Sequence, residues 1–409
     1  SSRRSVLGRV YAMLCVAPLG VVAWVWITDA LGDRGMTNVL TAMGVALSLL
    51  LGFGYFVVKS RAPARLRFGS LVACVALLAI TSRLVRIDGF SGAMIPQISW
   101  RATTQCATTC ATDACVPPQR ALGSRVDLDK TSPADYPGFL GARRDQTVRG
   151  VWLERDWERH PPELLWKQAI GAGWSAFAIR NGIAVTQEQR GARELVTAYD
   201  LRSGALLWKH AEDARKDHLA GGAGPRSTPL VDDGRVYALG ATSILVCLRG
   251  SDGALLWRKD LRAEFGISPQ VEAQRVHYGR SNSPLIVRDT LVVPVGGAVG
   301  APGLVAFEKQ RGTLLWKSPA RNVSQASPSF ARLAGRDQIL CVHEASVAGH
   351  DPCTGAILWE QAWPGRTSSD ASCSQARAIP PDRVLLSKGF GRGSALLRLR
   401  GARVEVLWA

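Results

Sequence analysis

The chain has 409 residues, 47% of them hydrophobic, a length that allows several domains or one large repeat array. Its formal net charge is +17, a balance that fits a nucleic-acid or anionic-lipid partner. The excess is mostly arginine scattered along the chain, without the Lys/Arg block of a nucleic-acid-binding tail. The composition therefore argues against nucleic acid as a partner.

Residues 1–87 contain three apolar runs and are predicted to form a membrane region. Transmembrane helices are expected at about 10–28, 35–58 and 68–85. The first two runs carry no charge and are long enough to cross ~30 Å of hydrocarbon. The third is shorter and is bounded by Arg67 and Arg83, so it spans only if these side chains reach the interface.

The basic residues near the runs predict the orientation of the chain in the membrane. They precede the first run and separate the second from the third, which predicts a cytoplasmic N-terminus. With three crossings, the chain after residue 87 lies in the periplasm; with two, it lies in the cytoplasm. We expect a multi-pass protein of the inner (cytoplasmic) membrane with its large domain on the periplasmic side.

Residues 88–160 are rich in Gly, Pro, Ser, Thr and Arg and show little periodicity, which predicts an irregular linker. The linker contains Cys106, Cys110 and Cys115. Their spacing fits neither a CxxC zinc pair, an iron–sulfur run nor a haem attachment motif, so no metal is predicted. A local disulfide and unpaired cysteines both stay open.

From residue 161 to 409 one motif recurs, first as "AYDLRSGALLWK" at 198–209 and last, in a weaker form, as "RLRGARVEVLWA" at 398–409. Short apolar strands and turns precede each copy, and the period is roughly 40–50 residues, which is typical of propeller blades. We expect an all-β propeller with five visible four-stranded blades. The recurring tryptophans are Trp166, Trp208, Trp257, Trp316, Trp359 and Trp408.

Tryptophan and glycine in the motif are predicted to be structural. A large half-buried indole is expected to wedge between neighbouring blades. A glycine four residues before the Trp closes the last hairpin, where a Cβ would clash. Acidic residues eight before the Trp are expected to accept hydrogen bonds from amides of the same turn. The glycines are Gly204, Gly253, Gly312 and Gly355, and the fifth copy has Val404 instead.

These copies resemble the repeats of the PQQ-like β-propeller superfamily, which includes quinoprotein dehydrogenases and the assembly factor BamB. With the N-terminal spans, "RIDGFSGAMIPQISWR" (86–101) and "DYPGFLGARRD" (135–145), the chain is most similar to membrane-anchored BamB-like propellers of planctomycete-type bacteria. The resemblance covers roughly residues 86–409. It implies seven or eight blades, so five blades and the lead-in strand "ELLWK" (163–167) suggest a truncated ring.

The resemblance also raises the hypothesis of an enzyme, which can be compared with the active site of quinoprotein dehydrogenases. Quinoprotein dehydrogenases hold PQQ against a tryptophan, below a vicinal cysteine pair and beside a calcium ion. No two cysteines are adjacent here, and no acidic calcium cluster is evident. We therefore expect no PQQ, no metal and no catalytic residue. The expected function is a non-catalytic protein-interaction scaffold for an envelope protein. The alternatives are a sensor for a small ligand or glycan and, less favoured, a PQQ-dependent oxidoreductase.

A binding site, if the propeller has one, is expected at the mouth of its funnel. The longest connection between blades, residues 261–283, is expected to lie there. Tyr278, Arg280 and Asn282 come just before a strand that enters the channel, as Arg226 does in the preceding blade. Ordinary solvated loop residues are the alternative interpretation of all four.

Overall fold

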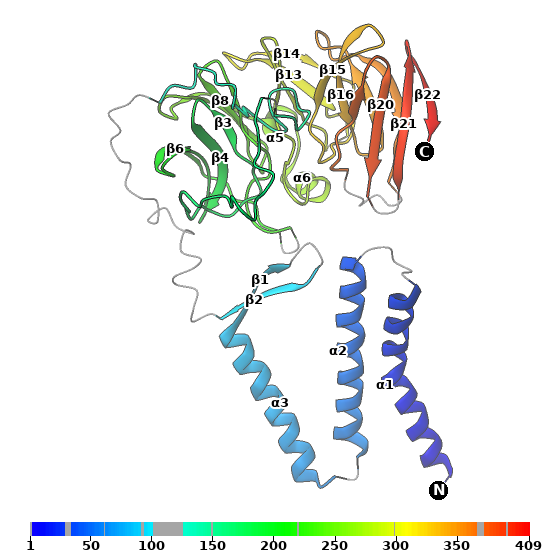
Figure 1. The fold of residues 1–409 in the computed structure, drawn as a ribbon. Helices are drawn as coiled ribbons and strands as arrows, with labels where there is room; N and C mark the ends of the chain where they lie inside the picture. The colour runs from blue at the N-terminus through cyan, green and yellow to red at the C-terminus, as the bar shows by residue number, and fades with distance from the viewer. Residues whose placement is uncertain are drawn as a thin grey trace. The chain divides into compact units, whose positions relative to one another are not determined.

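A computed structural model describes residues 2–28, 34–60, 62–90, 94–100, 126–148, 150–218, 221–297, 299–365, 372–389 and 392–409. The chain forms two compact units (Figure 1). One comprises Ser1–Thr109 with Leu219–Gly222, and the other comprises Cys110–His218 with Ala223–Ala409. Cys106, Cys110 and Cys115 lie outside the described residues.

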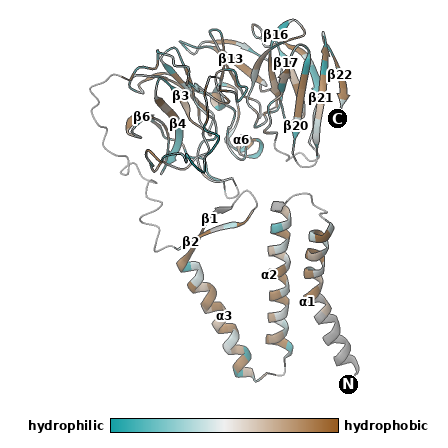
Figure 2. Cartoon of the chain, in the orientation of Figure 1, coloured by the Kyte–Doolittle hydropathy of each residue, from teal (hydrophilic) through white to brown (hydrophobic). Residues whose placement is uncertain are grey.

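The first unit begins with three helices, α1 (Ser2–Thr28), α2 (Arg34–Lys59) and α3 (Ala64–Leu84). Two of the helices in the described chain, α2 over Met36–Lys59 and α3, are long and apolar enough to cross a membrane, and both are coloured largely as hydrophobic in Figure 2. The apolar part of α1, Cys15–Thr28, is shorter, so the first predicted span stays a prediction.

Helices α1 and α2 pack closely at Gly44. A Cβ at this position would lie 2.6 Å from Val22 Cγ2 and 3.3 Å from the carbonyl oxygen of Pro18. Trp26 Nε1 also donates a hydrogen bond of 2.8 Å to Thr41 Oγ1. Small residues and interhelical hydrogen bonds are the usual contacts between helices in lipid. After α3, strands β1 (Val85–Phe90) and β2 (Pro96–Trp100) form an antiparallel hairpin.

The second unit holds five four-stranded antiparallel sheets, each built from consecutive strands, as a propeller requires. This confirms the predicted fold. We number the blades 1 to 5 and give the strands from inner to outer. They are β3 (Ala178–Arg180), β4 (Ile183–Arg190), β5 (Arg193–Asp200), β6 (Leu206–Glu212); β7 (Leu230–Asp232), β8 (Arg235–Leu239), β9 (Ile244–Arg249), β10 (Leu255–Asp260); β11 (Leu285–Val287), β12 (Thr290–Pro294), β13 (Leu304–Glu308), β14 (Leu314–Lys317); β15 (Ser329–Leu333), β16 (Arg336–Val342), β17 (Ser346–His350), β18 (Ile357–Ala362); and β19 (Arg377–Ile379), β20 (Arg383–Lys388), β21 (Gly393–Arg400), β22 (Arg403–Trp408).

The connection between blades 2 and 3 contains two short helices, α5 (Leu261–Glu264) and α6 (Pro269–Arg275). Asp260 caps α5 by accepting hydrogen bonds from two backbone amides, and the Ser268 hydroxyl caps α6. Pro269 follows at the first helical position, where its missing N–H costs nothing. The residues that interrupt the regular blade spacing therefore form an ordered element.

Each of the first four recurring tryptophans contacts the glycine of the next blade. A Cβ on Gly253 would lie 2.5 Å from Trp208 Cε3, and one on Gly312 would lie 2.8 Å from Trp257 Cδ2. The indole N–H of Trp208 donates to the carbonyl of Gly250, at 2.9 Å, in the same turn of blade 2. The same contact links Trp166 with Leu201, Trp257 with Lys309 and Trp316 with Pro352.

A register shift occurs beside the tryptophan in the outer hairpin of every blade. In blade 2 the pairing skips one residue between Leu255 and Trp257, and an equivalent shift occurs in the other four blades. Such a bulge turns a side chain out of the regular alternation. The turn carboxylates behave as expected: Asp200, for example, accepts hydrogen bonds from the amides of Arg202 and Ser203.

The fifth copy departs from this pattern, as its Val404 predicts. Arg400 pairs with Arg403 across a two-residue turn that contains Gly401 at φ +65°. Trp359 of blade 4 instead donates its indole N–H to Gln338 Oε1 within its own blade, at 2.5 Å. Trp408, in the last strand, is about half exposed.

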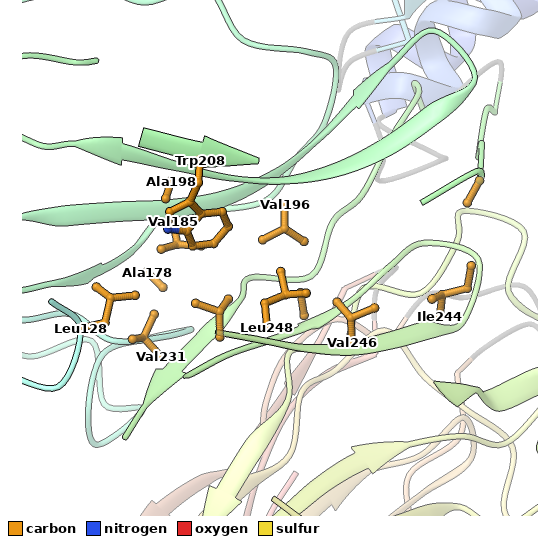
Figure 3. Close-up of a cluster of buried hydrophobic side chains, with 13 residues drawn as sticks. Leu128, Ala178, Val185, Val196, Ala198, Trp208, Val231, Ile244, Val246 and Leu248 are labelled. Carbon is orange, nitrogen blue, oxygen red and sulfur yellow. The ribbon is translucent and has the colours of Figure 1, made fainter. Parts of the chain in front are cut away.

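Hydrophobic clusters fill the spaces between consecutive blades. Figure 3 shows the one between blades 1 and 2, in which Val185 and Ala198 of blade 1 face Val246 and Leu248 of blade 2, with Trp208 alongside. Burial of this apolar surface between blades is the main stabilising term of such a repeat array.

Residues 126–148, inside the predicted linker, lack regular secondary structure but pack on the blades. Leu128 is buried in the cluster between blades 1 and 2. Tyr136 forms an antiparallel bridge with Ile179 of β3, and the carbonyl of Pro137 accepts a hydrogen bond from the amide of Val231 in β7. This part of the chain therefore runs along the inner edges of blades 1 and 2.

Candidate functional site

Two of the four predicted mouth residues are buried and bonded within the chain. Arg280 has no exposed surface, and its Nη2 donates to Glu272 Oε2 of α6 at 2.8 Å. Its Nε donates to Ser243 Oγ at 2.9 Å, and its Nη1 donates to the carbonyl of Val295. Arg280 therefore ties the long connection to blades 2 and 3, and its guanidinium faces protein groups.

Asn282 has a similar position between blades 3 and 4. Its side chain is 1% exposed, and its Nδ2 donates to the carbonyls of Ser324 and Ala326 at 3.0 and 2.6 Å. Those carbonyls belong to the segment that leads into β15. Asn282 thus fixes the start of one inner strand against the next, which is a structural role.

The other two predicted residues, Arg226 and Tyr278, lie together in an aromatic and cationic group. Arg226 Nε donates to the carbonyl of Tyr278 at 2.9 Å, and its guanidinium lies 5.6 Å from the ring of Trp174. The rings of His218 and His277 lie 4.8 and 4.1 Å from the ring of Tyr278. We call these five residues the mouth cluster.

The blade repeat explains why the mouth cluster forms at one end of the inner strands. Trp174 precedes the first residue of β3 by four positions, and Arg226 precedes the first residue of β7 by the same number. Ser281, Gln325 and Cys373 occupy this position in the other three blades. Sequence reasoning singled out Arg226 but missed Trp174, and alignment of the inner strands would have identified it.

The mouth cluster combines the charged guanidinium of Arg226 with the neutral imidazole of His218. Burial and the neighbouring His277, followed by Lys216 and Arg226, lower the pKa of His218 below its ordinary value of 6.5. His218 is therefore neutral at pH 7. Burial also lowers the pKa of Arg226 from 12.5, but a guanidinium stays charged at neutral pH. Trp174 is 65% exposed, so a partner can reach its ring.

Two features of a quinone-dependent active site can be compared with this chain. The sequence contains no adjacent pair of cysteines. Among the residues that the structure describes, no three His, Cys, Asp or Glu side chains are grouped so as to hold a metal ion. The adjacent cysteine pair that a quinoprotein dehydrogenase places above PQQ is therefore missing from this sequence.

Five consecutive four-stranded sheets with interlocking tryptophan and glycine define a β-propeller of PQQ-like repeats. The family model described as outer membrane protein assembly factor BamB matches residues 192–406, just over half of the chain. The chain belongs to this family. A search of curated proteins found no match to the sequence.

Several solved structures resemble the chain at low identity. BamB from Moraxella catarrhalis is 16% identical with a TM-score of 0.35, over 58% of this chain and 75% of that one. A europium-containing methanol dehydrogenase is 13% identical with a TM-score of 0.40, over 56% and 48%. The quinohemoprotein alcohol dehydrogenase ADHIIG from Pseudomonas putida HK5 is 16% identical with a TM-score of 0.42, over 69% and 47%. The chain spans about half the length of these two dehydrogenases.

Proposed function

We propose that the chain is a membrane-anchored, non-catalytic protein-interaction scaffold of the cell envelope, and that it binds a protein partner through the mouth cluster. The observation that carries the proposal is the grouping of Trp174, Arg226 and Tyr278 at one end of the inner strands. Tryptophan, tyrosine and arginine are the residue types that dominate the energetics of protein interfaces. The family description, which names an assembly factor, supports the same class of function.

The anchor in this proposal consists of α2 and α3, with α1 as a further crossing, and the propeller is placed in the periplasm. Cys353 provides a test because it is exposed in the outer turn of blade 4. A membrane-impermeant maleimide should label Cys353 in intact spheroplasts, and Cys353→Ser should remove that label. Labelling of Cys353 only after lysis would place the propeller in the cytoplasm.

The partner is tested by chemical crosslinking in native membranes, followed by capture of the full chain and quantitative mass spectrometry. The double variant Trp174→Ala/Arg226→Gln removes the centre of the mouth cluster. Loss of two hot-spot residues costs about 2 kcal/mol or more, which is about a thirtyfold loss of affinity. Recovery of the partner should therefore fall steeply.

The matched control is Trp152→Ala/Arg258→Gln, which removes the same two side-chain types. Trp152 is 92% exposed and Arg258 lies in the outer strand of blade 2, so both are outside the mouth cluster. The control should retain the partner. Equal loss in both double variants, or in neither, would contradict the proposed site.

An absorbance scan for bound quinone on the same captured protein separates the scaffold from a redox enzyme. The scaffold predicts envelope proteins in the capture and no quinone band. A stoichiometric quinone band would make the chain a redox protein with an unfamiliar site.

A further inference from the structure

Residues 135–146 cross from the inner edges of blades 1 and 2 to those of blades 3 and 4. Arg144 marks their far end: the guanidinium donates hydrogen bonds to the carbonyl of Pro328, at 2.6 Å, and to that of Pro284. These carbonyls directly precede inner strands β15 and β11. We call residues 135–146 the crossing segment.

A cleft of about 570 Å³ lies between the crossing segment and the inner strands of blades 1 to 4. This volume is within the range of ordinary ligand-binding clefts. Its walls combine apolar side chains with guanidinium groups. The apolar ones include Phe139, Leu230, Leu285, Ile286 and Phe330, and the arginines are Arg143, Arg144, Arg180 and Arg332.

Among the described residues, one guanidinium of the cleft, that of Arg144, has no carboxylate partner. Asp232 is the one carboxylate among its lining residues, and it already lies 2.8 Å from the ammonium group of Lys309. Arg144 has carbonyl oxygens as its hydrogen-bond acceptors among the described residues. Burial lowers the pKa of Arg144 to about 9, so the guanidinium remains charged at neutral pH and lacks a counter-charge of its own.

The other three arginines have carboxylate neighbours, and two of these pairs are exposed. Carboxylates lie 3.4 Å from Arg143, 3.9 Å from Arg180 and 3.1 Å from Arg332. The side chains of Arg143 and Arg332 are 49% and 70% exposed, and exposed ion pairs of this kind contribute little and exchange readily. An incoming carboxylate can therefore compete for Arg143 and Arg332.

The backbone next to the cleft is also available for pairing. The crossing segment bonds to the inner edges of β3 and β7. In blades 3 and 4, by contrast, β11 and β15 form backbone ladders on their outer side only, within the part of the chain that the structure describes. A free strand edge can accept an extended peptide through main-chain hydrogen bonds.

We propose that this cleft binds a short, extended, acidic peptide segment of the protein partner, with its carboxylates on the arginines and an aromatic or aliphatic side chain among Phe139, Ile286 and Phe330. The inference rests on the proposed scaffold function and adds the chemistry of the partner. Charge complementarity selects acidic residues, the apolar wall selects one large hydrophobic residue, and the strand edges of β11 and β15 select an extended conformation.

The test measures fluorescence anisotropy of a dye-labelled six-residue peptide with four acidic residues, one phenylalanine and one leucine. The protein is the full chain in a non-ionic detergent. The control peptide carries the isosteric amides in place of the four carboxylates. The acidic peptide should bind at least tenfold more tightly than the amide peptide, and its affinity should fall with rising salt.

Two double variants of equal charge locate the site. Arg143→Gln/Arg332→Gln removes two cleft arginines whose side chains are exposed. Arg202→Gln/Arg311→Gln removes two exposed arginines from outer turns of blades 1 and 3. The cleft variant should weaken binding of the acidic peptide at least tenfold, whereas the turn variant should leave it within twofold.

Absence of peptide binding, equal binding of the amide peptide, or equal weakening by the turn variant would each overturn the proposal. Failure of the proposed scaffold function can be distinguished from failure of the peptide cleft. If Arg143→Gln/Arg332→Gln leaves capture of the partner from membranes unchanged while the mouth-cluster variant abolishes it, the scaffold stands and the peptide cleft is refuted. If neither variant changes the capture, the proposed function fails.

Discussion

Replacement of Gly253 by alanine tests the interlocking of blades. Gly253 has φ +73°, and an alanine Cβ would lie 2.5 Å from Cε3 of Trp208 in the preceding blade. Trp208 is 3% exposed and its indole N–H is hydrogen-bonded, so displacement of the ring would break both its packing and this hydrogen bond. The left-handed backbone costs alanine about 1–2 kcal/mol, and overpacking adds about 1–3 kcal/mol. We expect Gly253→Ala to lose about 2–5 kcal/mol in total.

Gly401→Ala is the matched control, because it isolates the backbone cost. Gly401 has φ +65°, and nothing lies within 4 Å of an added Cβ. We expect a loss of about 1–2 kcal/mol there. Thermal unfolding of the full chain, followed by near-ultraviolet circular dichroism, measures both variants, at about 2–4 °C per kcal/mol. Equal melting temperatures for the two variants would refute the role assigned to the Trp–Gly contact.

Three further predictions concern buried charge. Burial and the adjacent His350 lower the pKa of His343 to about 3, so below about pH 6.5 the unfolded chain binds more protons than the folded one. The contribution of His343 to stability should therefore be full above pH 6.5 and should decline as the pH falls toward 3. Urea unfolding at pH 7 and pH 5 should show a smaller decline for His343→Asn than for the unchanged chain. Burial lowers the pKa of Lys309, but its ion pairs with Asp232 and Asp233 outweigh this effect and raise the pKa overall. Lys309→Met should lower the free energy of unfolding by roughly 1–3 kcal/mol, because both carboxylates keep some exposure. An unchanged urea midpoint would contradict the ion-pair role. Arg280→Met should lower the free energy of unfolding by about 3–5 kcal/mol, because it leaves the buried Glu272 without its ion-pair partner. Arg275→Met, on the exposed side of α6, should lower it by under about 1 kcal/mol. Equal melting temperatures for the two variants would contradict this prediction.

The blades were predictable because their signals are local. In three of the copies a turn carboxylate, a glycine with positive φ and a tryptophan lie within nine residues of one another, so these copies specify their own hairpins. The same locality places the helices, since a long apolar run needs no partner to be recognised.

The site was only partly predictable because its contacts join distant residues. Arg280 was expected at the funnel mouth, but its ion pair with Glu272 depends on how α6 folds back over blade 2. The crossing segment shows no periodicity, because its hydrogen bonds go to β3 and β7, which lie more than forty residues further along the chain. Trp174 lacked a distinguishing local pattern until the inner strands were placed in register.

The most direct test of the central claim places a photo-crosslinking amino acid, p-benzoylphenylalanine, at Trp174 in the membrane-inserted full chain. The same substitution at Trp152, which is exposed but outside the mouth cluster, is the control. Our account predicts a discrete crosslinked product with an envelope protein from position 174 and none from position 152. Crosslinks of equal yield from both positions, or none from position 174, would contradict the assignment of the mouth cluster as the partner-binding surface.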